Sequence, residues 1–247
     1  MSTNVTVVEN DQVRRALYLG NMVGGLVIGE KRNPADVANV LQVINDHSDF
    51  ASRLGAGPIL DSSKIREELI LWQKFDQKFF PDVNVGNYTA LRIPGMVSGF
   101  NWSIVNARGV SANQFVERMR KEYKIWTYSD DLNAIRSDRN AVSMSYVVLV
   151  RDRIAADEEL KNKSAEILAE EAIPAITLPE NLRLDAFHWW KTGRHLDPET
   201  WTLDAGSRDA DGYVPNVSWS AVNGRLYVGW YGPRNASGTL RARAVVS

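Results

Sequence analysis

The sequence contains no cysteine, which excludes a disulfide framework, thiolate catalysis, a zinc ribbon and an iron–sulfur cluster. Neither sign of charge is in excess. The 29 Lys and Arg residues oppose 30 Asp and Glu residues, and the formal net charge is −1. This balance argues against a strongly basic nucleic-acid-binding protein.

Long hydrophobic runs are also missing. The most apolar stretch covers residues 16–29 and is shorter than the ~20 residues that a spanning helix needs. The N-terminus shows neither a basic region nor a small-residue cleavage site, so it does not read as a signal peptide. We therefore expect a cytoplasmic protein with no membrane contact.

The 247 residues suffice for a sizeable core, and 44% hydrophobic with 24% charged residues is ordinary for a globular protein. The patterns predict an α+β fold in three regions. These are a helical region at 1–84, a mixed α/β region at 85–164, and a compact β-rich binding module at 165–247.

Apolar residues recur at helical spacing in several segments, often after a capping residue or a proline. Helices are predicted at 11–19, 34–44, 62–80, 111–123, 165–172 and 182–191. The apolar, β-branched or proline-bounded segments 88–93 and 142–150 are predicted strands. The charge-rich segment 151–163 is expected to be solvated. Asn223-Gly224 between two alternating segments, 217–221 and 225–231, predicts a β-hairpin.

Motifs of catalysis are not found. The sequence has no phosphate-binding loop, nucleophile elbow or zinc-protease helix. Asp185, His188, His195 and Asp197 could be imagined as a metal site, but a packing or surface role for His188 is favoured over it. We predict no catalytic residue, no metal site and no cofactor, and hence a protein that is not an enzyme.

The hairpin segments carry an informative alternation. Successive strand side chains point to opposite faces. One face would hold Val217, Trp219, Leu226, Val228 and Trp230, and it could be buried against the domain. The other would hold Asn216, Ser218, Ser220, Tyr227, Gly229 and Tyr231.

Tyr, Ser, Gly and Asn are the residue types enriched in antibody binding loops, where Tyr supplies contact area and the others adaptable hydrogen bonds. An alternative stays open: a turn-rich β module that uses Asn, Gly and Ser for turns and Tyr for cross-strand packing. On the first interpretation, the ligand-binding residues are Tyr213, Asn216, Ser218, Ser220, Asn223, Tyr227, Gly229, Tyr231, Asn235 and Ser237.

Over nearly its whole length the chain resembles a family of uncharacterised bacterial proteins that often occur as several paralogues. The resemblance implies no activity, because the family has none assigned. Its matching segments are Gly-Gly-Leu-Val-Ile-Gly-Glu at 24–30, Val-Arg-Asp-Arg at 150–153, Ala-Asp-Glu-Glu-Leu-Lys-Asn at 156–162, Gly-Arg-His-Leu-Asp at 193–197, Gly-Ser-Arg at 206–208 and Leu-Arg-Ala-Arg-Ala-Val-Val-Ser at 240–247.

The tail also resembles the end of a variable protein diversified by a retroelement, a class that ends in a C-type-lectin-like domain. The resemblance implies a fixed framework at 214–215, Val217, Trp219, Leu226, Val228 and Trp230, with the ten candidate residues diversified around it. The tripeptides and cysteines of calcium-dependent sugar-binding lectins are missing here. A protein ligand is therefore expected rather than a sugar.

Two hypotheses of function follow. The first is a non-catalytic protein that binds an unknown protein ligand through the Tyr/Asn/Ser/Gly face of the C-terminal module. The alternative is a nucleic-acid-associated protein or enzyme of a mobile element, in which arginines among the aromatic residues would contact a strand. Nearby acidic residues weaken that alternative. The arginines concerned are Arg208, Arg225, Arg234, Arg241 and Arg243.

Overall fold

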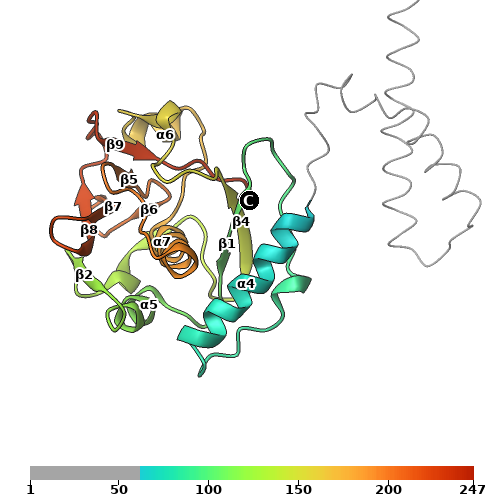
Figure 1. The fold of residues 1–247 in the computed structure, drawn as a ribbon. Helices are drawn as coiled ribbons and strands as arrows, with labels where there is room; N and C mark the ends of the chain where they lie inside the picture. Colours follow the sequence, from blue (N-terminus) through green and yellow to red (C-terminus); the bar gives the residue numbers. More distant parts are fainter. Residues whose placement is uncertain (1–61) are drawn as a thin grey trace, which may run out of the picture. The chain divides into compact units, whose positions relative to one another are not determined.

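In the computed structural model, residues 62–247 are described, and they belong to one compact unit. The helices predicted at 11–19 and 34–44 lie outside the described residues. The described part is α+β, with helices and a mixed sheet, as the sequence patterns predict (Figure 1).

Helix α4 (Ser63–Phe79) confirms the helix predicted at 62–80. Its apolar side chains Ile65, Leu69, Trp72 and Phe75 recur at three- and four-residue spacing and are all buried. The helix ends at Phe79, two residues before a proline that cannot continue it.

A two-stranded antiparallel sheet pairs β1 (Trp102–Asn106) with β4 (Tyr146–Val150). The predicted strand at 142–150 is thus shorter than expected, because its first residues lie in a loop: Val142 is 82% and Met144 67% exposed. The last four residues of each strand are buried.

The strand predicted at 88–93 is wrong. Tyr88–Ala90 forms a short 3-10 helix, and the side chain of Asn87 accepts a hydrogen bond from the Thr89 amide at its start. The phenol of Tyr88 points inward and donates to Asp76 of α4 at 2.5 Å. A turn capped by the Asn87 side chain therefore forms where the residue types had favoured a strand.

Helix α7 (Leu178–Thr192) begins four residues before the predicted start at 182. Pro179 lies in its first turn, where a proline is tolerated because its missing N–H would have no helical partner there. Thr177 and Glu180 form a reciprocal capping box, and Gly193 ends the helix with a left-handed φ of 72°. These start and stop residues place α7 at 178–192 rather than at the predicted 182–191.

Helices α5 (Ala112–Met119) and α6 (Ala165–Glu170) are each shorter than predicted. Ser111 and Ser164 cap them by accepting backbone N–H bonds. The charged segment between β4 and α6, with a 3-10 turn at Glu158–Leu160, is only partly solvated, since Asp157 is buried and paired with Arg151 at 2.5 Å.

The larger sheet has five strands, which are β2 (Lys124–Thr127), β5 (Trp201–Leu203), β7 (Val214–Ser220), β8 (Arg225–Tyr231) and β9 (Leu240–Ala242). Their order across the sheet is β2-β8-β7-β5-β9. The hairpin is confirmed, and Gly224 in its turn has a φ of 55° that favours glycine. The pairs β2–β8 and β5–β9 are parallel, while β8–β7 and β7–β5 are antiparallel. A separate short pair joins β3 (Arg136–Ser137) to β6 (Ser207–Arg208).

Helix α7 lies between the two main sheets and packs against β1 on one side and β7 on the other (Figure 1). One main core therefore runs from Ile65 in α4 to Val245 near the chain end. The pairing of β2 with β8 joins the predicted middle region 85–164 to the predicted module 165–247 in a single sheet.

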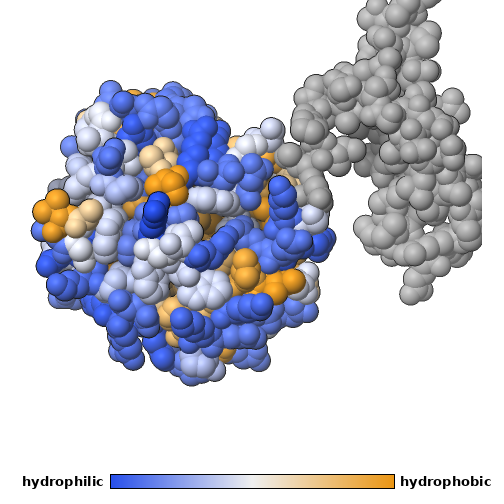
Figure 2. All heavy atoms as spheres, in the orientation of Figure 1, coloured by the Kyte–Doolittle hydropathy of each residue, from blue (hydrophilic) through white to orange (hydrophobic). Residues whose placement is uncertain are grey.

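In the view of Figure 2, the described part has a mainly hydrophilic surface with apolar side chains in small separate spots. Within residues 62–247, the helices are too short or too polar for any of them to cross a bilayer.

Candidate functional site

The register of β7 and β8 divides the hairpin side chains into two faces. Val217 is opposite Val228, and Ser218 is opposite Tyr227. Directly opposed residues share a face, so the alternation expected from the sequence is confirmed. We call the face with Val217 the inner face and the face with Tyr227 the outer face.

The inner face packs against the main core. Val217, Leu226 and Val228 are at most 2% exposed, and Trp219 packs on the same core. The expectation of burial is wrong for Trp230, which is 46% exposed. Trp230 lies near the end of β8 and rests on Tyr128, with ring centroids 4.9 Å apart.

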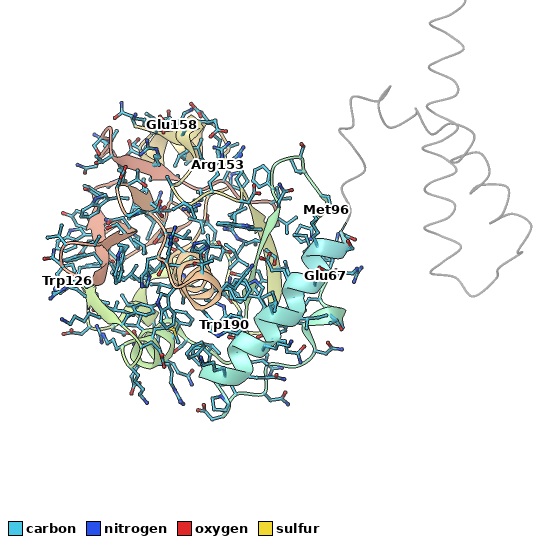
Figure 3. The ribbon with its side chains drawn as sticks, in the orientation of Figure 1. Glu67, Met96, Trp126, Arg153, Glu158 and Trp190 are labelled. Carbon is cyan, nitrogen blue, oxygen red and sulfur yellow. The ribbon has the colours of Figure 1, made fainter. Side chains whose placement is uncertain are left out.

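Two tryptophans from distant segments join the outer face. Trp126 of β2 pairs with Tyr227, and their ring centroids are 5.8 Å apart. Thr202 of β5 is paired with Val217 of the antiparallel strand β7. Trp201, one residue earlier on β5, therefore lies opposite Ser218, one residue later on β7. Trp126 is 42% and Trp201 36% exposed. Figure 3 shows Trp126 at the outer edge of the unit, beside β2.

The adjacent row of the outer face holds Gly229, Asn216 and Leu203, which are paired across three strands. Tyr231 lies one row beyond it. The rings of Trp201 and Tyr231 meet edge to face with centroids 6.1 Å apart. Because these two residues lie on opposite sides of the Asn216 row, their contact crosses that row.

Four partly exposed aromatic side chains therefore surround small polar positions on the outer face. We call this set the aromatic surface, defined as Trp126, Trp201, Tyr227 and Tyr231. It is a concentration of large, rigid side chains on a well-paired sheet.

Asn216 lies within this surface and is fully buried. Within residues 62–247, neither its Oδ1 nor its Nδ2 has a hydrogen-bond partner. A buried polar group left unpaired costs about 1–3 kcal/mol, so such a group calls for an explanation. The amide covers Gly229, where an added Cβ would lie 3.2 Å from Oδ1.

The hairpin brings seven of the ten predicted ligand-binding residues together. Tyr227, Tyr231 and Ser220 are half-buried, and Asn223 is exposed and donates to the Tyr227 hydroxyl at 3.1 Å. The other three are buried, so the expected solvent exposure is wrong for them. These three are Asn216, Ser218 and Gly229.

The remaining three predicted residues lie in turns beside the sheet. Tyr213 is 42% exposed and follows a turn in which Asp209 accepts its amide hydrogen bond. The backbone of Asn235 closes a turn onto Gly232, and the hydroxyl of Ser237 contacts that of Thr239. At these positions the turn-rich interpretation accounts for the residue types.

Trp126 and Trp201 were not anticipated from the sequence. Each lies on a strand of three or four residues that pairs with residues far away along the chain. Periodicity over so few residues carries little information. The available signal was the tryptophan itself, a residue type enriched where proteins bind one another.

The arginines proposed to contact nucleic acid do not form one open cationic surface. Arg243 is buried against Asp197, Arg241 binds Glu158, and Arg234 binds Glu166. Arg208 donates to two backbone carbonyls. Arg225 lies 5.8 Å from the Tyr227 ring.

Beneath the inner face, His195 and Asp185 form a second polar group. Nδ1 of His195 lies 2.8 Å from Asp185, and the imidazole stacks on Trp219 with centroids 3.7 Å apart. Tyr123 meets the imidazole edge to face, and burial, with Asp185 nearby, raises the pKa of Tyr123 well above its usual value. The rings of Trp219 and Tyr123 therefore both contact the imidazole of His195 beneath the hairpin.

Of the four imagined metal residues, Asp185 and His195 form the hydrogen-bonded pair described above, whereas His188 and Asp197 contact other residues. His188 lies against Trp102 with centroids 5.3 Å apart, and burial lowers the pKa of His188. Asp197 is engaged by Arg243. In the part of the chain that the structure describes, no three His, Asp or Glu side chains converge in a way that could hold a metal ion.

The chain matches no protein-family model, no curated protein sequence and no solved structure.

Proposed function

We propose that this chain is a non-catalytic binding protein that recognises a protein ligand through the outer face of its five-stranded sheet. The observation that carries the proposal is the aromatic surface. Trp and Tyr dominate the energetic centres of protein interfaces, and the hairpin places small polar residues between them. Tyr227 and Asn223, whose side chains are hydrogen bonded, illustrate this combination.

The charge of the surface supports a protein ligand. The residues between its aromatic side chains are the uncharged Ser218, Asn216 and Gly229. Its two cationic residues, Lys124 and Arg225, are paired across β2 and β8 at one end of the face. Charged residues are depleted at the centres of protein interfaces, while Tyr, Trp and Arg are enriched there. A nucleic-acid strand would instead require an open basic groove. Of the five arginines considered for that role, the four other than Arg225 already bind carboxylates or backbone carbonyls.

The finer assignments belong to the same proposal. The resemblance of the tail supports a variable protein with a C-type-lectin-like fold that is diversified by a retroelement, and a cytoplasmic location is part of this view. The test is the DNA around the gene. A near-copy of the segment encoding residues 212–247 that differs only at adenines, beside a reverse transcriptase, is expected. Its absence would contradict diversification but not binding.

The binding test uses the full chain, immobilised, and a display library of random peptides as the probe. Tyr227→Ala and Tyr231→Ala should each weaken binding of the enriched peptides by about 2 kcal/mol, near thirtyfold, while the fold remains intact. Trp230→Ala is the matched control, since Trp230 is an exposed aromatic residue on the same strand but on the inner face.

Equal losses in all three variants would contradict the proposed face. The absence of any enriched peptide would contradict peptide recognition by this surface. Circular dichroism and a thermal melt of each variant separate lost contacts from lost structure.

A further inference from the structure

The carboxamide of Asn216 is unpaired at both ends. In residues 62–247, neither the acceptor Oδ1 nor the donor Nδ2 of this buried side chain has a hydrogen-bond partner. Asn106 of β1 leaves only its Nδ2 unpaired. Because buried polar groups in folded proteins are nearly always hydrogen bonded, the Asn216 amide is an unused pair of hydrogen-bonding sites.

The surroundings of this amide suit a binding site. Gly229 provides the space beneath it, since any side chain there would crowd the amide at 3.2 Å. The contact between Trp201 and Tyr231 crosses its row, and Trp201 is 36% exposed. Tyr231 also packs against the small buried cluster that contains Leu203 and Val214. A change of rotamer of the two rings would keep the backbone pairing, and it is the motion that access to the amide requires.

The chemistry of an unpaired carboxamide selects its partner. Oδ1 accepts and Nδ2 donates, so a matching group must present a donor beside an acceptor. A carboxylate would satisfy Nδ2 but oppose Oδ1, and a cation would do the reverse. An amide has both groups in the required arrangement.

We propose that Asn216 is the amide-recognition residue of the outer face: an amide of the ligand enters between Trp201 and Tyr231 and pairs with both Oδ1 and Nδ2. This inference rests on the proposed function. In a protein ligand, the amide is supplied by an Asn or Gln side chain or by the N–H and C=O of one extended residue. Both sources share this chemistry.

The experiment measures the affinity of peptides selected from the random library on the full-length chain. Asn216→Leu keeps the side-chain size but removes both polar atoms, and it should lower the affinity at least tenfold while the melting temperature stays equal or rises. Gly229→Ala should also lower the affinity, because it displaces the amide. Asn106→Leu is the control, a buried amide on the other sheet, and it should leave the affinity unchanged.

Two changes in the peptide identify the source of the amide. Replacement of each Asn or Gln by Asp or Glu tests a side-chain amide, and N-methylation of each backbone amide tests the main chain. A peptide change that lowers the affinity for the parent protein should have no effect on the affinity for the Asn216→Leu variant.

Unchanged affinity in Asn216→Leu and Gly229→Ala, together with a loss in Tyr227→Ala, would overturn the inference and leave the proposed function standing. Affinity that none of these variants changes would overturn both, as would a library that yields no binder.

Discussion

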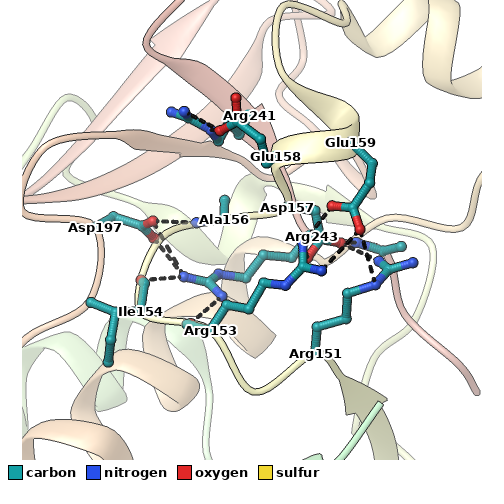
Figure 4. A network of polar contacts seen from close by, with 11 residues as sticks. Arg151, Arg153, Ile154, Ala156, Asp157, Glu158, Glu159, Asp197, Arg241 and Arg243 are labelled. Atoms are coloured by element: carbon teal, nitrogen blue, oxygen red, sulfur yellow. Dashed lines mark hydrogen bonds and ion pairs between the residues drawn. The ribbon is translucent and has the colours of Figure 1, made fainter. Parts of the chain in front are cut away.

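Arg243 and Asp197 form an ion pair in which both side chains are buried, at most 3% exposed. The Arg243 Nη2 lies 3.2 and 3.1 Å from the two carboxylate oxygens and also donates to the Ile154 carbonyl at 2.8 Å (Figure 4). Asp197 in turn accepts the Ala156 amide at 2.8 Å. The pair thus joins the end of the chain to the loop that follows α7 and to the loop after β4.

Arg243→Met should therefore destabilise the fold strongly. The substitution leaves the Asp197 carboxylate buried without its counter-charge, and breaking a buried pair in this way costs about 3–5 kcal/mol. Urea unfolding followed by tryptophan fluorescence measures the change. Arg241→Met is the control, because its partner Glu158 is exposed and the unfolding midpoint should stay close to that of the parent protein.

Asp204 predicts a pH dependence of stability. Its carboxyl group is fully buried, accepts the Asn181 amide at 2.7 Å and has no partner at Oδ2 within residues 62–247. Burial raises the pKa of Asp204 well above the usual 3.8. The folded state then holds this proton more tightly than the unfolded state, so the stabilisation is fully present below about pH 4 and is lost as the pH rises toward the folded pKa.

The measurement is the free energy of unfolding of Asp204→Asn across this pH range. The variant keeps an acceptor for Asn181 and removes the ionisation, so it should gain on the parent protein as the pH increases. Glu170→Gln, at an exposed position, should follow the parent curve. Parallel curves for the parent protein and Asp204→Asn would show that Asp204 ionises freely in the fold.

The two tryptophans of the hairpin should differ in their effect on stability. Trp219→Ala removes a ring that stacks on His195 and packs on the main core, with an expected cost of about 3 kcal/mol. Trp230→Ala should cost clearly less, because Trp230 is 46% exposed. Similar losses in thermal and urea unfolding would show that both rings are equally buried.

Gly206 lies where a side chain would collide with backbone. An added Cβ would be 2.7 Å from the Ala175 carbonyl oxygen, and the Gly206 amide already donates to Ile176. Gly206→Ala should destabilise by about 1–3 kcal/mol, because the backbone must shift. Gly238→Ala, with nothing within 4 Å of its added Cβ, is the matched control and should leave the melting temperature equal or slightly higher.

Local regularities in the sequence were enough to predict α4 and the hairpin. The apolar spacing from Ile65 to Phe79 is that of one buried helix face, and Asn223-Gly224 fits a tight turn between two alternating strands. The same alternation correctly placed Val217 and Val228 on one face. Alternation describes direction only, and it could not show that Trp230 extends past the core.

The sequence left two points ambiguous: the residue at which α7 starts, and the secondary structure of residues 88–93. Pro179 fits either the end of one helix or the first turn of the next, and Tyr88 has the residue type of a strand. Contacts decided both. The capping box of Thr177 and Glu180 starts α7, and the Tyr88–Asp76 hydrogen bond holds the turn inside the core.

The sequence by itself determined the α+β class, the hairpin with its two faces, and the polar and aromatic character of one of these faces, because each of these follows from spacing along a few neighbouring residues. Only the tertiary structure brought Trp126 and Trp201 to that face and buried Asn216 within it without a hydrogen-bond partner. Those positions depend on pairings between strands far apart in the chain, and non-local pairing leaves no period in the sequence.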